Sequence, residues 1–152
     1  MNFKLGLIGH YWDKVPTYQI VIDDTTVKEG QISAESGTSE IIEFDLDLAE
    51  GDHVLKVRFT NKTNEQTVKD NEEDPDNYEI VKDMTLEIDT IEVDQVDLGE
   101  MKWDGIYRVD KPVSYNGEEN VTEIQRCTNM GWNGQYEFRF STPFYLWLLD
   151  NI

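Results

Sequence analysis

The chain has 152 residues, about the length of one domain, and 38% of them are apolar and 30% charged. Thirty-two acidic and thirteen basic side chains leave a net charge of −19, which argues against nucleic acid and anionic membranes as partners. Aromatic residues make up 11% of the chain, including four Trp, more than a disordered acidic tail would contain. We therefore expect one folded domain over residues 1–152.

Alternation of apolar and polar residues is the dominant pattern along the chain. In chain order it covers residues 18–22, 42–48, 55–59 and 136–140. Turn-forming clusters separate such runs at Asp23-Asp24, Glu50-Gly51-Asp52, Asn116-Gly117 and residues 130–134. Period-two alternation is typical of strands with one face on a core, and no stretch has a sustained helical period. The sequence predicts an all-β protein.

An acidic loop is expected near residues 63–82. Residues 65–100 carry 14 acidic and 2 basic side chains, a net charge of −12, and the acidic density begins at Asp70. Calcium prefers carboxylate and carbonyl oxygens on flexible loops. The candidate metal ligands are Asp70, Glu72, Asp74, Asp76 and Asp83. Because their spacing follows no helix–loop–helix pattern, a solvated loop without metal is the alternative.

The apolar positions between Met84 and Leu98 change phase twice. They fall on even numbers up to Ile88, on odd numbers at Ile91 and Val93, and on even numbers again from Val96. A slip of one residue turns a strand's side chains to the other face. We therefore expect bulges, or a strand that bends between two packed sheets. This predicts an antiparallel two-sheet β-sandwich or jelly roll.

Residues 143–149 form the most apolar stretch of the chain. We predict a final core strand here, with an exposed docking strip for a neighbouring subunit as the alternative.

Aromatic side chains in turn-rich segments are the candidates for sugar stacking. These candidate carbohydrate-binding residues are Tyr11, Trp12, Trp103 and Trp132. Trp132 lies between Gly131 and Asn133-Gly134, a setting unlike the middle of a core strand. For each Trp, core packing is the competing interpretation.

Catalytic patterns are missing from the sequence. There is no Gly-x-Ser-x-Gly elbow and no phosphate-binding glycine loop. His53 follows a turn, where a structural hydrogen bond is the expected role and metal binding the alternative. We predict that the protein is not an enzyme.

The middle of the chain resembles the calcium-dependent, xylan-binding type of carbohydrate-binding module. One strand of that family matches Gly51, His53, Leu55, Val57, Phe59 and Asn61, and a later strand matches Asp83, Leu86, Ile88, Asp89, Ile91 and Val93. An earlier strand is echoed by Val21-Ile22-Asp23, so the similarity runs from Tyr18 to Val93. The resemblance implies a β-sandwich, a glycan partner and calcium as cofactor. It also implies an Asp after Asn61 that helps hold calcium, where this chain has Lys62.

Stand-alone modules of this kind resemble virion proteins of tailed bacteriophages. The resemblance implies a non-catalytic structural or surface-binding protein, made in the bacterial cytoplasm and located in the virion. Its expected partners are other virion proteins, copies of itself or a surface glycan. Two alternatives come from other classes: an acidic decoy that imitates DNA toward a host protein, and a hydrolase that degrades glycans.

Overall fold

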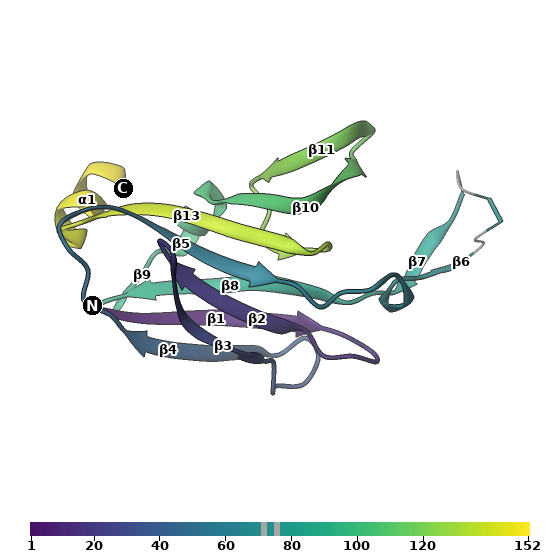
Figure 1. Ribbon diagram of the computed structural model, residues 1–152, viewed down its shortest axis with the longest axis horizontal. Coiled ribbons are helices and arrows are strands. Elements are labelled where there is room, and N and C mark those ends of the chain that lie inside the picture. The colour runs from purple at the N-terminus through teal and green to yellow at the C-terminus, as the bar shows by residue number, and fades with distance from the viewer. Residues whose placement is uncertain (71–72, 75–76) are drawn as a thin grey trace.

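A computed structural model of the chain describes residues 1–70, 73–74 and 77–152 (Figure 1). Its elements in chain order are β1 (Asn2–His10), β2 (Thr17–Ile22), β3 (Thr25–Gln31), β4 (Ser39–Asp45), β5 (Gly51–Phe59), η1 (Asn64–Gln66), β6 (Val68–Asp70), β7 (Glu79–Lys82), β8 (Thr85–Val93), β9 (Val96–Asp97), η2 (Gly99–Asp104), β10 (Ile106–Tyr115), β11 (Glu118–Gln125), β12 (Asn129–Met130), β13 (Gly134–Thr142) and α1 (Phe144–Asn151).

Two antiparallel sheets form the body of the protein. In the described residues, the first sheet has the order β12-β8-β1-β4 with β9 beside β8, and the second has the order β11-β10-β13-β5-β2-β3. The sheets lie face to face, and Figure 1 shows β1, β4 and β8 behind and below β5 and β13. The predicted all-β sandwich is confirmed.

The core lies between the two sheets. Every second residue of β1 contributes to it, and Phe3, Leu5 and Leu7 are fully buried. Phe3 stacks on Phe44 of the neighbouring strand with ring centroids 5.0 Å apart, and meets the edge of Phe140 from the opposite sheet at 6.1 Å. The alternating apolar residues of each strand thus point inward and contact side chains of the opposite sheet.

The first phase change in residues 84–98 is a β-bulge. Gly6 of β1 pairs with Thr90, but the next residue, Leu7, pairs with Ile88, so Asp89 is the extra residue. The second phase change has a different cause. Asp94 and Gln95 have φ values of 47° and 71°, which make the tight turn from β8 to β9. The strand therefore doubles back and stays in its sheet.

The C-terminal apolar segment is a helix, so the predicted final strand is wrong. Phe144 is buried and lies 5.7 Å from the ring of Trp147, which meets Phe138 of β13 edge-on at 5.9 Å. An apolar spacing of three residues places both rings on one face of a helix. Tyr145 and Leu149 are exposed on the other face.

The segment expected as an acidic loop has regular structure at both ends. It begins with η1 and continues as the two-stranded hairpin β6–β7, which projects beyond the sandwich at the right of Figure 1. In the described part of the chain, no helix is both long and apolar enough to cross a membrane.

Candidate functional site

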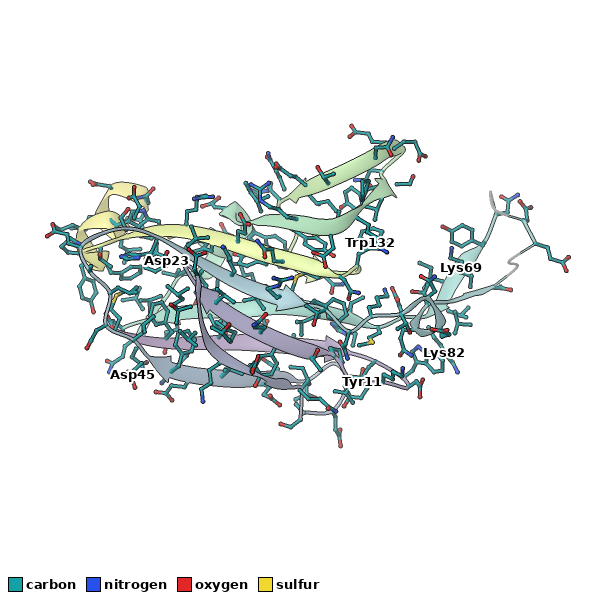
Figure 2. All side chains as sticks on the ribbon, viewed as in Figure 1. Tyr11, Asp23, Asp45, Lys69, Lys82 and Trp132 are labelled. Atoms are coloured by element: carbon teal, nitrogen blue, oxygen red, sulfur yellow. The ribbon has the colours of Figure 1, made fainter. Side chains whose placement is uncertain are left out.

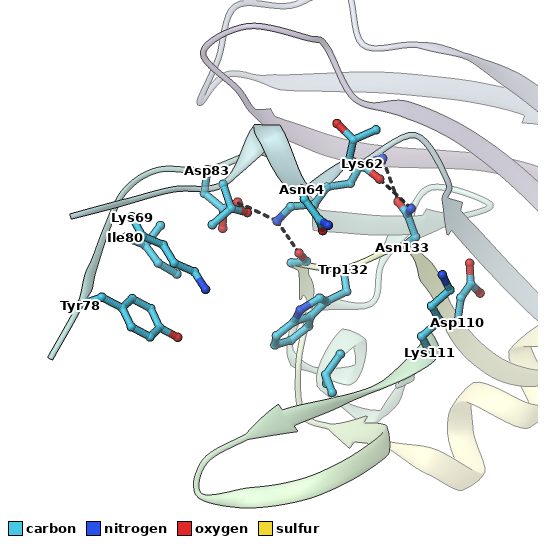
Figure 3. A pocket seen from close by; sticks show the side chains of 14 residues that line it. Lys62, Asn64, Lys69, Tyr78, Ile80, Asp83, Asp110, Lys111, Trp132 and Asn133 are labelled. Carbon is cyan, nitrogen blue, oxygen red and sulfur yellow. Dashed lines mark hydrogen bonds and ion pairs between the residues drawn. The ribbon is translucent and has the colours of Figure 1, made fainter. Parts of the chain in front are cut away.

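A groove of about 790 Å³ lies where four segments meet at one end of the sandwich (Figure 3). Its walls are the chain after β5, the β6–β7 hairpin, and the turn between β12 and β13 with the neighbouring part of β10. Figure 2 places two of its lining residues, Trp132 and Lys69, at this end, with Asp23 farther toward the other. The groove is thus assembled from segments far apart in sequence.

Trp132 is the larger of the two aromatic side chains that line the groove. Its side chain is 38% exposed, and the ring of Tyr115 meets it edge-on at 6.3 Å. The Tyr107 hydroxyl accepts a hydrogen bond from the backbone N–H of Trp132 at 2.8 Å and donates one to its carbonyl oxygen. Burial raises the pKa of Tyr107, which keeps this hydroxyl protonated. The indole is therefore an exposed ring on a fixed backbone.

Lys62 forms the floor of the groove, although its side chain is only 10% exposed. Its Nζ donates to Asp83 Oδ1 at 2.6 Å and to the carbonyl oxygen of Gly131 at 2.5 Å. The same carboxylate oxygen accepts hydrogen bonds from the Thr67 hydroxyl at 2.8 Å and the Met84 N–H at 2.9 Å. One ammonium group thus joins the hairpin side of the groove to the turn before β13.

The backbone of Lys62 is fixed by the side chain of Asn133. The Lys62 N–H donates to Asn133 Oδ1 at 2.9 Å, and Asn133 Nδ2 donates to the Lys62 carbonyl at 2.9 Å. The amide pairs with the backbone three residues after the end of β5, as another strand would, and it lies next to the last β5–β13 pair, Gly134 with Phe59. This reciprocal pair positions the floor of the groove.

The hairpin contributes a second aromatic wall. Tyr78 is 41% exposed, and Lys69 Nζ lies 4.4 Å from the centre of its ring, within the range of a cation–π contact. Figure 3 shows both side chains across the groove from Lys111 of β10. None of these three residues is among the site residues predicted from the sequence. The available signal was that Tyr78 is the one aromatic residue within 63–82.

Trp132 is the one predicted sugar-binding residue that lines this groove. Tyr11 is half-buried and donates its hydroxyl to the Ala34 carbonyl at 2.8 Å. Trp12 is 42% exposed, donates its Nε1–H to the Gln66 carbonyl at 2.9 Å, and has Lys82 Nζ 4.9 Å from its ring centre. Trp103 is half-buried in η2. The four predicted residues do not form one surface.

The candidate calcium ligands do not assemble a site in the described residues. No group of three or more His, Cys, Asp or Glu side chains is placed there to hold a metal ion. Asp70 ends β6, Asp74 accepts a hydrogen bond from Asn77, and Asp83 holds Lys62. Glu72 and Asp76 lie outside the described residues. At Asp83, a candidate calcium ligand, the carboxylate therefore binds the Lys62 ammonium group instead.

His53 has the structural role that the sequence analysis expected. Its Nδ1 lies 2.8 Å from Asp23 Oδ2 and its Nε2 lies 2.7 Å from the Ala49 carbonyl oxygen. Burial disfavours the charged imidazole, but the hydrogen bonds to Asp23 and Ala49 outweigh it and raise the pKa of His53. The ring joins the β2–β3 turn to β5, away from the groove.

Known proteins resemble this chain in three-dimensional structure and not in sequence. No family model matches the sequence, and no curated protein matches it significantly. A solved structure described as vCBM60 in complex with galactobiose superposes with a TM-score of 0.59 at 12% identity, covering 91% of this chain and 97% of that one. The selenomethionine form of vCBM60, described as linking two families of calcium-dependent carbohydrate binding modules by circular permutation, has a TM-score of 0.56 at 12% identity over 90% of this chain and 88% of that one. At this identity the likeness establishes a shared sandwich fold.

Proposed function

We propose that this protein is a carbohydrate-binding module that holds a glycan in the groove beside Trp132. The observation that carries the proposal is an exposed indole, fixed at its backbone by Tyr107, in the wall of a groove of about 790 Å³. Sugar rings present C–H faces that pack on aromatic rings, while their hydroxyls need polar partners at the rim. The neighbour described as bound to galactobiose supports the same class of ligand.

The remaining lining residues suit a hydroxylated ligand. Lys69, Lys111, Asn64 and Asp110 place donors and acceptors around the groove. Tyr78 offers a second ring on the hairpin, so a chain of two or more sugar units has an aromatic contact at each side. Neutral sugars suit a protein of net charge −19, since a polyanionic glycan would be repelled over long range.

The test is a titration of the protein with galactobiose and with a xylan oligosaccharide, followed by Trp132→Ala. A Trp anchor in an interface typically contributes about 2 kcal/mol, so we expect the variant to bind roughly thirtyfold more weakly. Trp103→Ala is the matched control, because Trp103 lies in η2 and outside the groove-lining set. Equal binding by wild type and Trp132→Ala would remove the groove from consideration. A fold check by circular dichroism accompanies each variant.

We extend the proposal to a location in a bacteriophage particle, with the module bound to other virion proteins or to a host surface glycan. The resemblance in residues 18–93 supports this extension. Mass spectrometry of the purified particle tests it, and absence of the chain from the particle would refute it.

A further inference from the structure

We propose that the Lys62 ammonium is a built-in cation that serves the groove in place of a divalent metal. Nζ lies 2.6 Å from a carboxylate oxygen of Asp83 and 2.5 Å from the carbonyl oxygen of Gly131. Carboxylate and carbonyl oxygens are the atoms with which proteins surround calcium. The groove therefore has a place lined by oxygen atoms that suits a cation, and the ammonium group of Lys62 occupies it.

Burial and connectivity show that this ammonium is part of the architecture. The Lys62 side chain is 10% exposed and that of Asp83 is 28% exposed, so water screens the pair weakly. Lys62 is 21 residues from Asp83 and 69 residues from Gly131 along the chain. A single cation thus joins the chain after β5 to the segment before β8 and to the turn after β12, next to the Met130–Leu86 strand pair. A surface ion pair, by contrast, joins two mobile side chains and contributes little.

Calcium, which the description of one neighbour names, does not fit here. A divalent ion between Asp83 and Gly131 would lie within a few ångströms of the ammonium, and like charges at that separation repel strongly where water is excluded. No alternative cluster of ligands exists in the described residues. Lysine and calcium are therefore mutually exclusive at this position, and among the described residues the groove has its cation in Lys62.

Thermal melting of the wild type and of Lys62→Ala tests the proposal without any sugar. We expect the wild-type Tm to be equal in millimolar calcium chloride and in sodium chloride of the same ionic strength, with EDTA causing no loss. Without the ammonium the Asp83 carboxylate keeps only its hydrogen bonds from Thr67 and Met84, so Lys62→Ala should melt roughly 3–12 °C lower. With the ammonium gone, calcium should raise the Tm of this variant more than matched sodium chloride does.

Two further variants localise the effect. Lys28→Ala removes the same charge from the exposed strand β3 and should show neither the loss nor the calcium response. Lys62→Ala combined with Asp83→Asn removes the carboxylate as well and should lose the calcium response of the single variant. If Lys62→Ala does not fold, the wild-type comparison and Lys62→Met, which keeps the length of the side chain, still decide the question.

Four results would overturn the proposal. Two concern stability: a calcium-specific rise in the wild-type Tm, and a Lys62→Ala variant as stable as Lys28→Ala. Two concern the calcium response: a Lys62→Ala variant whose Tm does not respond to calcium, and a response that persists in the double variant with Asp83→Asn. The consequence for sugar binding rests on the proposed function. Galactobiose binding that survives EDTA is the expected result, and binding that EDTA abolishes would contradict the built-in cation. Failure to bind sugar under both conditions would count against the proposed function and leave the melting results as they stand.

Discussion

Individual side chains at both ends of the sandwich supply hydrogen bonds where the strands no longer pair. At one end, Asp23 Oδ2 lies 2.8 Å from His53 Nδ1, and Asp23 Oδ1 accepts the Val54 N–H at 3.0 Å. At the other end, Asn133 exchanges two hydrogen bonds with the Lys62 backbone. Both nitrogens of His53 face acceptor oxygens, an arrangement that favours the ring with two protons.

The stabilisation from His53 is expected to depend on pH. The pKa of His53 is raised, so its contribution is complete below the unfolded value near 6.5 and declines as the pH rises through the folded pKa. Burial raises the pKa of Asp23, but hydrogen bonds from His53 and Val54 outweigh burial, so the pKa is lowered. The stabilisation from Asp23 is therefore lost only as the pH falls through its folded pKa. His53→Gln should therefore lower the free energy of unfolding more at about pH 5.5 than at about pH 8.5.

Urea unfolding of wild type and variant at both pH values measures this difference. His10→Gln is the control, because the His10 side chain is 41% exposed in its pair with Glu87 and exposed pairs contribute little. An equal loss for His53→Gln at both pH values would contradict the role assigned to the protonated ring.

The elements around the groove are positioned by close backbone contact between β10 and β13. At Gly134, an added Cβ would lie 2.2 Å from the Arg108 carbonyl oxygen and 2.9 Å from the Val109 Cα. Both atoms belong to the backbone of the partner strand and cannot move without opening the sheet. This contact sets the position of β10, which carries Lys111 and Val113 into the groove wall.

Gly134→Ala is therefore expected to lower the free energy of unfolding by about 1–3 kcal/mol through overpacking, and to weaken sugar binding by displacing β10. Gly131→Ala is the matched control, since an added Cβ there meets no atom within 4 Å and the carbonyl that holds Lys62 is retained. Urea denaturation of both variants gives the comparison. Equal stability of the two variants would show that the β10–β13 spacing tolerates a side chain.

At the scale of the whole molecule, the net charge of −19 opposes the compact state through self-repulsion. Salt shortens the range of that repulsion, because the Debye length falls from about 30 Å at 0.01 M to about 8 Å at 0.15 M ionic strength. We expect the Tm to rise over this range by the same amount in sodium chloride and in potassium chloride. A flat or falling Tm would mean that the acidic side chains are already neutralised by their neighbours.

The sequence alone was sufficient for the class of fold and for many local features. Alternation predicted β2, β4, β5 and β13, and paired turn residues predicted the β2–β3 and β10–β11 turns, where Asp23, Asn116 and Gly117 have positive φ. These features are local, because a side-chain period and a turn conformation depend on adjacent residues. β1 has the same alternation in Phe3, Leu5 and Leu7, which the sequence analysis did not select.

The tertiary structure decided the helix and the groove. In residues 143–149 nearly every side chain is apolar, so periodicity did not separate a strand from a helix, and packing of Phe144 and Trp147 near β13 selected the helix. Of the predicted aromatic residues, Trp132 lines the groove because it comes just before β13, and the start of β13 pairs with the end of β5. The contacts of Lys62 span 21 and 69 residues, distances over which no local pattern carries information. The sequence showed that a lysine stands after Asn61, and the fold determined that its charge lies between Asp83 and Gly131.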